Sequence, residues 1–306
     1  MKTRTSRHRP FRIYHLAFII CCFLGTGCNL FGPRPERPDA KAPPIPTGHL
    51  DKPSPEQLVR YLNRESSRLQ SIQTTDLSIS VWSQGNSAGL EGTLLCQKPR
   101  YFKLVGKKLG SQEVLVGSNE DRFWFYIKRD PSDALYHCSH TEYANGSSAE
   151  LPFPFQPEWV LEALGMGQID PGARFRVEDD KATYRLIEDA KLRGQPIRKV
   201  TVFYKGAAHN EQPQVKARML YDDRDRLICQ ATVKSVRRIG SVTIPQEIKL
   251  QWPAQDTTLV LDLGQGVQLN RQLSMEAFQM PRLGSKQVDL ARDRPTGRRV
   301  VPASFR

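Results

Sequence analysis

The chain has 306 residues and a formal net charge of +13, from 45 Lys and Arg against 32 Asp and Glu. Five of the basic residues and none of the acidic ones precede Cys28, and residues 282–306 hold an excess of five further positive charges. The part between is nearly balanced, which argues against a nucleic-acid-binding domain with a basic face.

Residues 1–27 are typical of a secretory signal peptide. Five Lys and Arg lie among the first 12 positions, an apolar run of 12 residues follows at 13–24, and the small residues Gly25, Thr26 and Gly27 end it. This order of charged, apolar and small residues predicts a cleavable export signal. A membrane-spanning helix needs about 20 apolar residues, so an uncleaved anchor is disfavoured.

Cys28 is the expected site of a lipid anchor. The residues from Leu24 to Cys28 resemble a bacterial lipobox, in which diacylglycerol is attached to a cysteine that follows small residues. The usual Leu three positions before the cysteine is replaced by Gly25 here. We expect a bacterial envelope protein that is anchored by lipid on its periplasmic side. Asn29, rather than Asp, favours the outer membrane over the inner.

A tether and a helix follow the cysteine. Residues 28–53 are rich in Pro, which favours an extended chain that holds the next domain away from the membrane. Ser54 is placed to cap a helix, with Pro55 in its first turn and Gln57 at the capping-box position. Apolar residues then recur at helical spacing, which predicts one amphipathic helix to about residue 70.

Beyond the helix the apolar residues recur at every second position, as in half-buried strands. Residues 130–157 are interpreted as a loop, and residues 158–164 as a short helix that Gly165 ends. The strands are expected at residues 77–81, 90–96, 101–105, 113–117, 122–128, 173–177, 182–187, 197–204, 215–221, 227–234, 245–252 and 258–263.

These elements predict a mainly β (α+β) fold in one domain, residues 54–281. The turns are short enough for hairpins, whereas parallel pairs would need crossovers of a dozen or more residues. We therefore expect a large, curled antiparallel sheet, or incomplete barrel, with one N-terminal helix and a short covering helix. Residues 282–306 are expected to be a flexible basic tail that suits an anionic envelope surface.

Two hairpins carry a resemblance to a known family. Residues 92–104 contain an apolar strand, then Lys98-Pro99, then a strand with aromatic and basic residues. Residues 114–126 form the next expected hairpin, with an apolar first strand and an aromatic second strand. This passage resembles the LolA/LolB lipoprotein carriers, and the lipid anchor places the chain nearer LolB. The resemblance covers residues 55–128 in motif and the remainder in strand pattern only. It implies an incomplete antiparallel barrel whose helices plug an apolar hollow that holds acyl chains.

The resemblance suggests which residues line such a cavity. Residues 123–127 are apolar throughout, which is typical of a strand buried on both faces. One side of this strand is expected to face the cavity, beneath the short helix. The cavity residues expected on this basis are Leu94, Phe102, Leu104, Trp124, Tyr126 and Trp159.

No catalytic constellation is apparent in the sequence, and we expect no enzyme, cofactor or metal. His137, Cys138 and His140 have the residue types of metal ligands, but their spacing fits no zinc site. Cys96, Cys138 and Cys229 allow either one disulfide or three buried thiols. Two functions remain open: a protein that binds lipid or lipoprotein acyl chains, and an assembly lipoprotein with a filled core that contacts protein partners.

Overall fold

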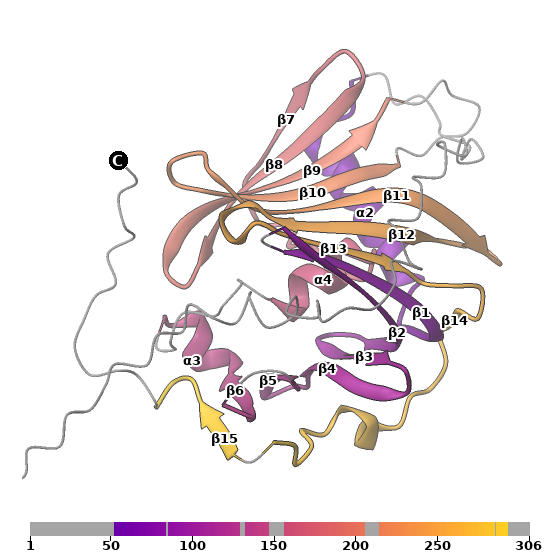
Figure 1. The fold of residues 1–306 in the computed structure, drawn as a ribbon. Coiled ribbons are helices and arrows are strands. Elements are labelled where there is room, and N and C mark those ends of the chain that lie inside the picture. The colour runs from indigo at the N-terminus through magenta and orange to yellow at the C-terminus, as the bar shows by residue number, and fades with distance from the viewer. Residues whose placement is uncertain are drawn as a thin grey trace, which may run out of the picture.

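The computed structural model describes residues 52–83, 85–128, 132–146, 156–205, 214–284 and 286–292. The signal peptide, Cys28 and almost all of the tether lie outside these residues. In the described part, 15 strands form one open sheet, accompanied by a few short helices (Figure 1). The helices are α2 (Pro55–Ser67), α3 (His140–Ala144) and α4 (Pro157–Ala163), with 3-10 turns η2 (Pro253–Gln255) and η3 (Met275–Phe278). The strands are β1 (Ser71–Ser83), β2 (Asn86–Gln97), β3 (Tyr101–Lys108), β4 (Ser111–Ser118), β5 (Arg122–Ile127), β6 (Ala134–Ser139), β7 (Phe175–Asp179), β8 (Thr183–Leu192), β9 (Gln195–Tyr204), β10 (Val215–Asp222), β11 (Leu227–Ile239), β12 (Val242–Trp252), β13 (Thr257–Asp262), β14 (Gln268–Leu269) and β15 (Lys286–Asp289).

Two meanders make up the sheet. Strands β1 to β6 form the first and β7 to β13 the second, and each strand pairs antiparallel with the next. The meanders join where β1 pairs with β13, from Ser78 opposite Asp262 to Ser83 opposite Thr257. β7 and β15 are the two free edges, so the sheet is open. This arrangement confirms the predicted mainly β fold and is consistent with an incomplete barrel.

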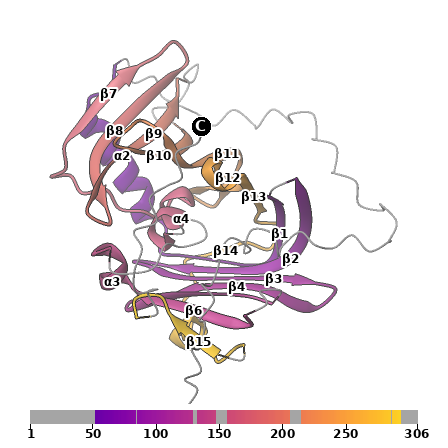
Figure 2. The ribbon, with the colours of Figure 1, turned by 60° about the vertical axis from the view of Figure 1, so that its left-hand side comes forward.

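The helices α2 and α4 lie on the same side of the sheet, which we call the inner face (Figure 2). α2 begins as predicted: the backbone amide of Gln57 donates to the Ser54 hydroxyl, and the Gln57 side chain accepts from the Ser54 amide. Its buried residues Leu58, Val59 and Leu62 pack on β8 and β9. α4 begins at Pro157 and ends before Gly165, whose φ of +84° suits a residue without a side chain.

Two segments differ from the sequence prediction. The expected loop at 130–157 contains β6 and α3, because Ala134, Leu135 and Cys138 bury their side chains against β5. The expected tail after residue 281 contributes β15, which pairs parallel with β6 and leaves Leu290 only 7% exposed. The domain boundary after residue 281 is therefore wrong, because the folded part continues into residues 286–292. Of the predicted tail, residues 285 and 293–306 lie outside the description.

None of the helices described is both long enough and apolar enough to cross a bilayer.

Candidate functional site: the covered inner face

An apolar row crosses the first meander on its inner face. Leu94 lies opposite Leu104, which lies opposite Val116, and the row continues to Phe125 and Tyr136. Such directly opposed residues have Cβ atoms about 5 Å apart, so their side chains touch. The first four belong to one buried cluster and Tyr136 packs against it, so the row forms a continuous apolar surface over β2 to β6.

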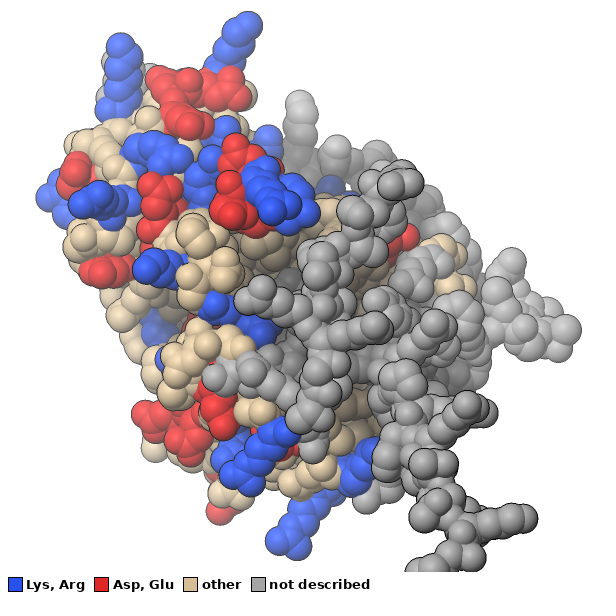
Figure 3. Space-filling model, turned by 90° about the vertical axis from the view of Figure 1, so that its left-hand side faces the viewer, with Lys and Arg blue, Asp and Glu red and all other residues tan. Residues whose placement is uncertain are grey.

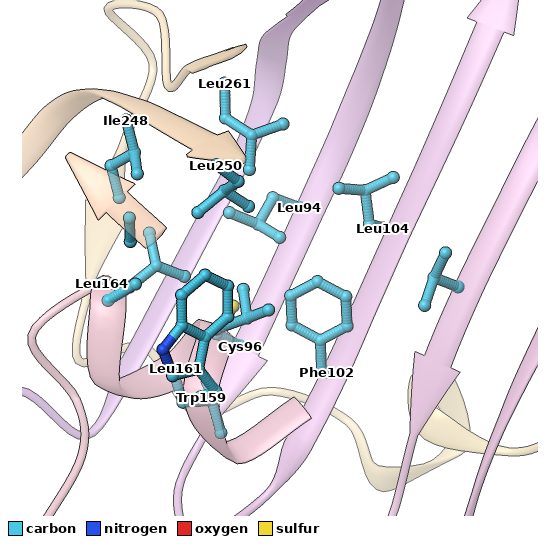
Figure 4. Close-up of a cluster of buried hydrophobic side chains, with 14 of the residues drawn as sticks. Leu94, Cys96, Phe102, Leu104, Trp159, Leu161, Leu164, Ile248, Leu250 and Leu261 are labelled. Atoms are coloured by element: carbon cyan, nitrogen blue, oxygen red, sulfur yellow. The ribbon is translucent and has the colours of Figure 1, made fainter. Parts of the chain in front are cut away.

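α4 covers this surface. Trp159 projects from the helix towards the strands, and Leu161 and Leu164 lie beside it (Figure 4). Trp159 also contacts Trp252 of β12 edge-to-face, with 6.1 Å between ring centroids. Its indole Nε1 is buried and has no hydrogen-bond partner among the described residues. The side chains around the helix come from both meanders: Leu94, Cys96, Phe102, Leu104, Ile248, Leu250 and Leu261.

The structure brings four of the six predicted cavity residues together. Leu94, Phe102, Leu104 and Trp159 all belong to the cluster beneath α4, and each is at most 7% exposed. That these four side chains line a ligand cavity stays a prediction.

Trp124 and Tyr126 lie on the opposite, outer face, so their prediction as cavity residues is wrong. Side chains alternate along a strand, and on β5 it is Phe123 and Phe125 that reach the inner cluster. Trp124 packs with Leu115 and Leu135 under residues 280–283, and Tyr126 borders the same outer cluster.

In the outer cluster, the Trp124 ring packs directly against Gly117. The two residues pair across β4 and β5, and a side chain at position 117 would have its Cβ 2.4 Å from the indole ring. Glycine thus leaves the space that the ring fills. The Tyr126 hydroxyl donates to the Asp133 carboxylate at 3.0 Å, which fixes the strand beside it. We interpret this cluster as structural packing.

A charged group lies at the other end of α4, where sequence reasoning expected none. The carboxylate of Glu162 contacts Lys199 Nζ of β9 at 3.2 Å and a guanidinium nitrogen of Arg218 of β10 at 3.8 Å. Arg218 also donates to the Thr201 hydroxyl at 3.4 Å, and Glu188 of β8 is paired opposite Lys199 in the sheet. We call Glu162, Glu188, Lys199 and Arg218 the charged band.

Burial shifts the pKa values of the residues in the charged band. It raises the pKa of Glu188, since a carboxylate loses solvation there, although Lys199 partly opposes the effect. Burial alone would lower the pKa of Lys199, but Glu162 and Glu188 outweigh it and raise that pKa. Burial lowers the pKa of Arg218, against the attraction of the same two carboxylates. A guanidinium keeps its proton at neutral pH, so the band contains permanent positive charge inside the fold.

The first turn of α4 is tied to the other meander. Glu158 lies 3.5 Å from Arg100, which follows β2, and 3.8 Å from Nδ1 of His140 in α3. Glu158 and Glu162 are four residues apart and so lie one above the other on the helix. Their ionic contacts therefore connect α4 to both halves of the sheet.

Ser118, His140 and Glu158 have the residue types of a hydrolase triad, but the hydrogen bonds oppose that role. His140 Nε2 is 2.9 Å from the carbonyl oxygen of Asn119, which can only accept, so this nitrogen carries the proton. It therefore cannot accept the proton of Ser118, whose hydroxyl lies 3.3 Å away and is fully buried. Burial also lowers the pKa of His140. A general base for Ser118 is not formed in this arrangement.

The remaining candidates for chemistry are buried cysteines. Cys96, Cys138 and Cys229 are buried and none of them forms a disulfide, which resolves the alternative left open by the sequence. Burial raises the pKa of the Cys96 and Cys229 thiols, which disfavours the reactive thiolate. Within the described ranges, no group of three or more His, Cys, Asp or Glu is arranged to hold a metal ion.

Comparison with known proteins finds solved structures of similar fold but no match by sequence. No protein-family model matches the chain, and no curated protein matches it in sequence. Among solved structures it is similar to a DUF1329 family protein from Desulfovibrio piger, with a TM-score of 0.51, 14% identity, and 74% of this chain and 95% of that one covered.

Two further similarities have TM-scores of 0.48. One is to a LolA superfamily protein from Nitrosomonas europaea, at 11% identity over 74% of this chain and 98% of that one. The other is to a putative outer membrane lipoprotein-sorting protein domain from Vibrio parahaemolyticus, at 14% identity over 72% and 95%. The chain is similar in fold to the DUF1329 family protein, and the resemblance to the LolA/LolB carriers that the sequence suggested stays a prediction. At such identities the likeness shows the fold alone, and the closer relation to LolB stays a prediction.

Proposed function

We propose that this protein binds lipid or lipoprotein acyl chains on its inner face, in the space that α4 occupies in this structure. The observation that carries the proposal is the apolar surface shared by both meanders and covered by a helix of only seven residues. Ligand sites of this kind are concave and mainly apolar, with few polar groups. The activity proposed is binding, without catalysis or a cofactor.

An acyl chain can replace α4 energetically. Exposing Trp159, Leu161 and Leu164 would cost about 1.5–3 kcal/mol each, so about 5–9 kcal/mol together. Each methylene buried in exchange gains about 0.8 kcal/mol, and a chain of about a dozen methylenes offsets the whole cost. The exchange needs no new polar contact, because the row from Leu94 to Phe125 that α4 covers is apolar.

The proposed setting is the bacterial envelope. The export signal and lipobox-like residues before Cys28 support a lipid-anchored protein facing the periplasm, with the outer membrane favoured. The resemblance to the LolA/LolB carriers supports a role in outer-membrane lipoprotein localisation. On the face shown in Figure 3, Lys and Arg are interspersed with Asp and Glu, which argues against a basic nucleic-acid-binding surface on that face.

Neighbouring residues of β3 provide the test, because Leu104 faces the inner cluster and Val105 the outer one. The delipidated protein would be titrated with a fluorescent fatty acid. We expect saturable binding that Leu104→Gln weakens at least about tenfold, the equivalent of one buried apolar side chain. Val105→Gln should stay close to wild type. Absence of saturable binding to a folded wild-type protein would contradict the proposal.

The alternative is an assembly lipoprotein whose core is filled. It is favoured by the side chains labelled in Figure 4, which are at most 7% exposed with α4 in place. In that case α4 is a permanent part of the core, and Leu104→Gln would lower stability without affecting the binding of any lipid.

A further inference from the structure

The charged band occupies an unexpected place on the inner face. On β9, Ile197, Lys199, Thr201 and Phe203 share that face, because side chains at every second position point the same way. Ile197 belongs to the cluster under α4 and Phe203 to the cluster under α2. Two cationic side chains, from Lys199 and its near neighbour Arg218, therefore lie at the border between two apolar clusters, where core residues are ordinarily apolar.

Arg218 is buried, and its polar contacts are long. The residue is 8% exposed, and a guanidinium offers five N–H donors. Among the described residues its contacts are the Thr201 hydroxyl at 3.4 Å and Glu162 at 3.8 Å, and the second exceeds hydrogen-bond length. A buried cation with such long contacts has donors available for a further anionic oxygen.

The charge of the band depends on α4. With the helix in place, Glu162 and Glu188 balance Lys199 and Arg218. Removal of α4 takes Glu162 away from the charged band. The three residues that remain on the strands, Glu188, Lys199 and Arg218, then carry one excess positive charge. In a protein interior such a charge is strongly unfavourable unless an anion replaces the lost carboxylate.

We propose that Arg218 and Lys199 bind the anionic group of an amphiphile, a phosphate or carboxylate, in the position that Glu162 holds here. The inference rests on the proposed function and names its ligand class, an anionic lipid. Leu220 and Ile197 are each two residues along the strand from one of the two cations and belong to the cluster under α4. If the headgroup binds at the charged band, its acyl chain therefore extends into that cluster. Arg favours this role because its fork of donors matches phosphate and carboxylate oxygens.

The test compares a fluorescent fatty acid with the fluorescent alcohol of the same chain. We expect wild type to bind the acid more tightly than the alcohol. Arg218→Met, combined with Glu162→Gln to keep the band balanced, should weaken acid binding about tenfold to a hundredfold, the range expected for charge-assisted hydrogen bonds. Alcohol binding should change less than about threefold. Arg198→Met is the matched control, since Arg198 is on the outer face with Asp225 and Tyr221.

The outcomes separate the two proposals. Equal binding of acid and alcohol by wild type, or an acid preference that survives the double substitution, would overturn the headgroup site while leaving acyl binding intact. Failure of both probes to bind the folded protein would overturn the proposed function itself. Inorganic phosphate that displaces the acid as potently as an unlabelled fatty acid does would show a site for a free anion, and would overturn the assignment to a lipid.

Discussion

Replacement of Trp159 by Ala should strengthen acyl binding, although it removes a buried aromatic residue. If α4 must move off the inner face before an acyl chain can bind there, the measured affinity is the intrinsic affinity multiplied by the fraction of molecules with α4 displaced. Trp159 is 3% exposed in the covered state and would be exposed in the displaced one. The substitution therefore destabilises the covered state and increases the displaced fraction.

The size of the effect follows from the surroundings of Trp159. Truncation of a buried Trp costs about 3–5 kcal/mol. The buried Nε1 of this residue lacks a partner among the described residues, and its removal returns about 1–3 kcal/mol. A net change of about 2 kcal/mol corresponds to about thirtyfold tighter binding of a fluorescent fatty acid, until displacement no longer limits the affinity.

Trp124 provides the control. It is equally buried, its Nε1 also has no partner in the described part of the chain, and it lies in the outer cluster. Urea unfolding of Trp124→Ala and Trp159→Ala should show similar losses of stability, but only the second should bind the probe more tightly. Weaker binding by Trp159→Ala, or an equal change in both variants, would refute the displacement of α4.

Three further predictions concern other parts of the molecule. Cys28→Ser should move the protein from the membrane to the soluble fraction on cell fractionation, and full retention would favour an uncleaved anchor. Leu109→Asn should raise the free energy of unfolding in urea by about 1 kcal/mol, because Leu109 is 99% exposed with a φ of +49° and Asn tolerates this conformation; a loss of stability would contradict the strain. Burial lowers the pKa of His140 below its ordinary 6.5, so the unfolded chain binds the proton first and stability should fall as the pH drops through about 6.5. His140→Asn should reduce the difference in unfolding free energy between pH 7.5 and 5.5, and an unchanged difference would contradict this assignment.

Much of the fold was predictable because its local signals agree with its tertiary packing. The Ser54 capping box marks the start of α2, and the alternation of apolar residues marks most strands of both meanders. β6 was missed because it is short and its His and Cys suggested a polar loop. β15 was missed because Val288 is the only apolar residue among its four, so its pairing with β6 depends on contacts distant in sequence.

The candidate site was only partly predictable. On β5 every residue from 123 to 127 is apolar, so alternation cannot distinguish the inner face from the outer, and the wrong pair was chosen. The charged band was missed because the sequence analysis did not ask which face of their strands Lys199 and Arg218 share with apolar residues. Lys199 is in phase with Ile197 and Phe203, and that signal could have placed its charge on a buried face.

Native mass spectrometry of the purified protein tests the central claim most directly. In the Cys28→Ser protein no lipid is expected at residue 28, so any lipid adduct would report occupancy of the fold. We expect a folded protein with a non-covalent lipid adduct that is lost on delipidation and restored by a fatty acid. A folded protein that shows only its own mass, before and after incubation with the fatty acid, would contradict the account and favour a filled core.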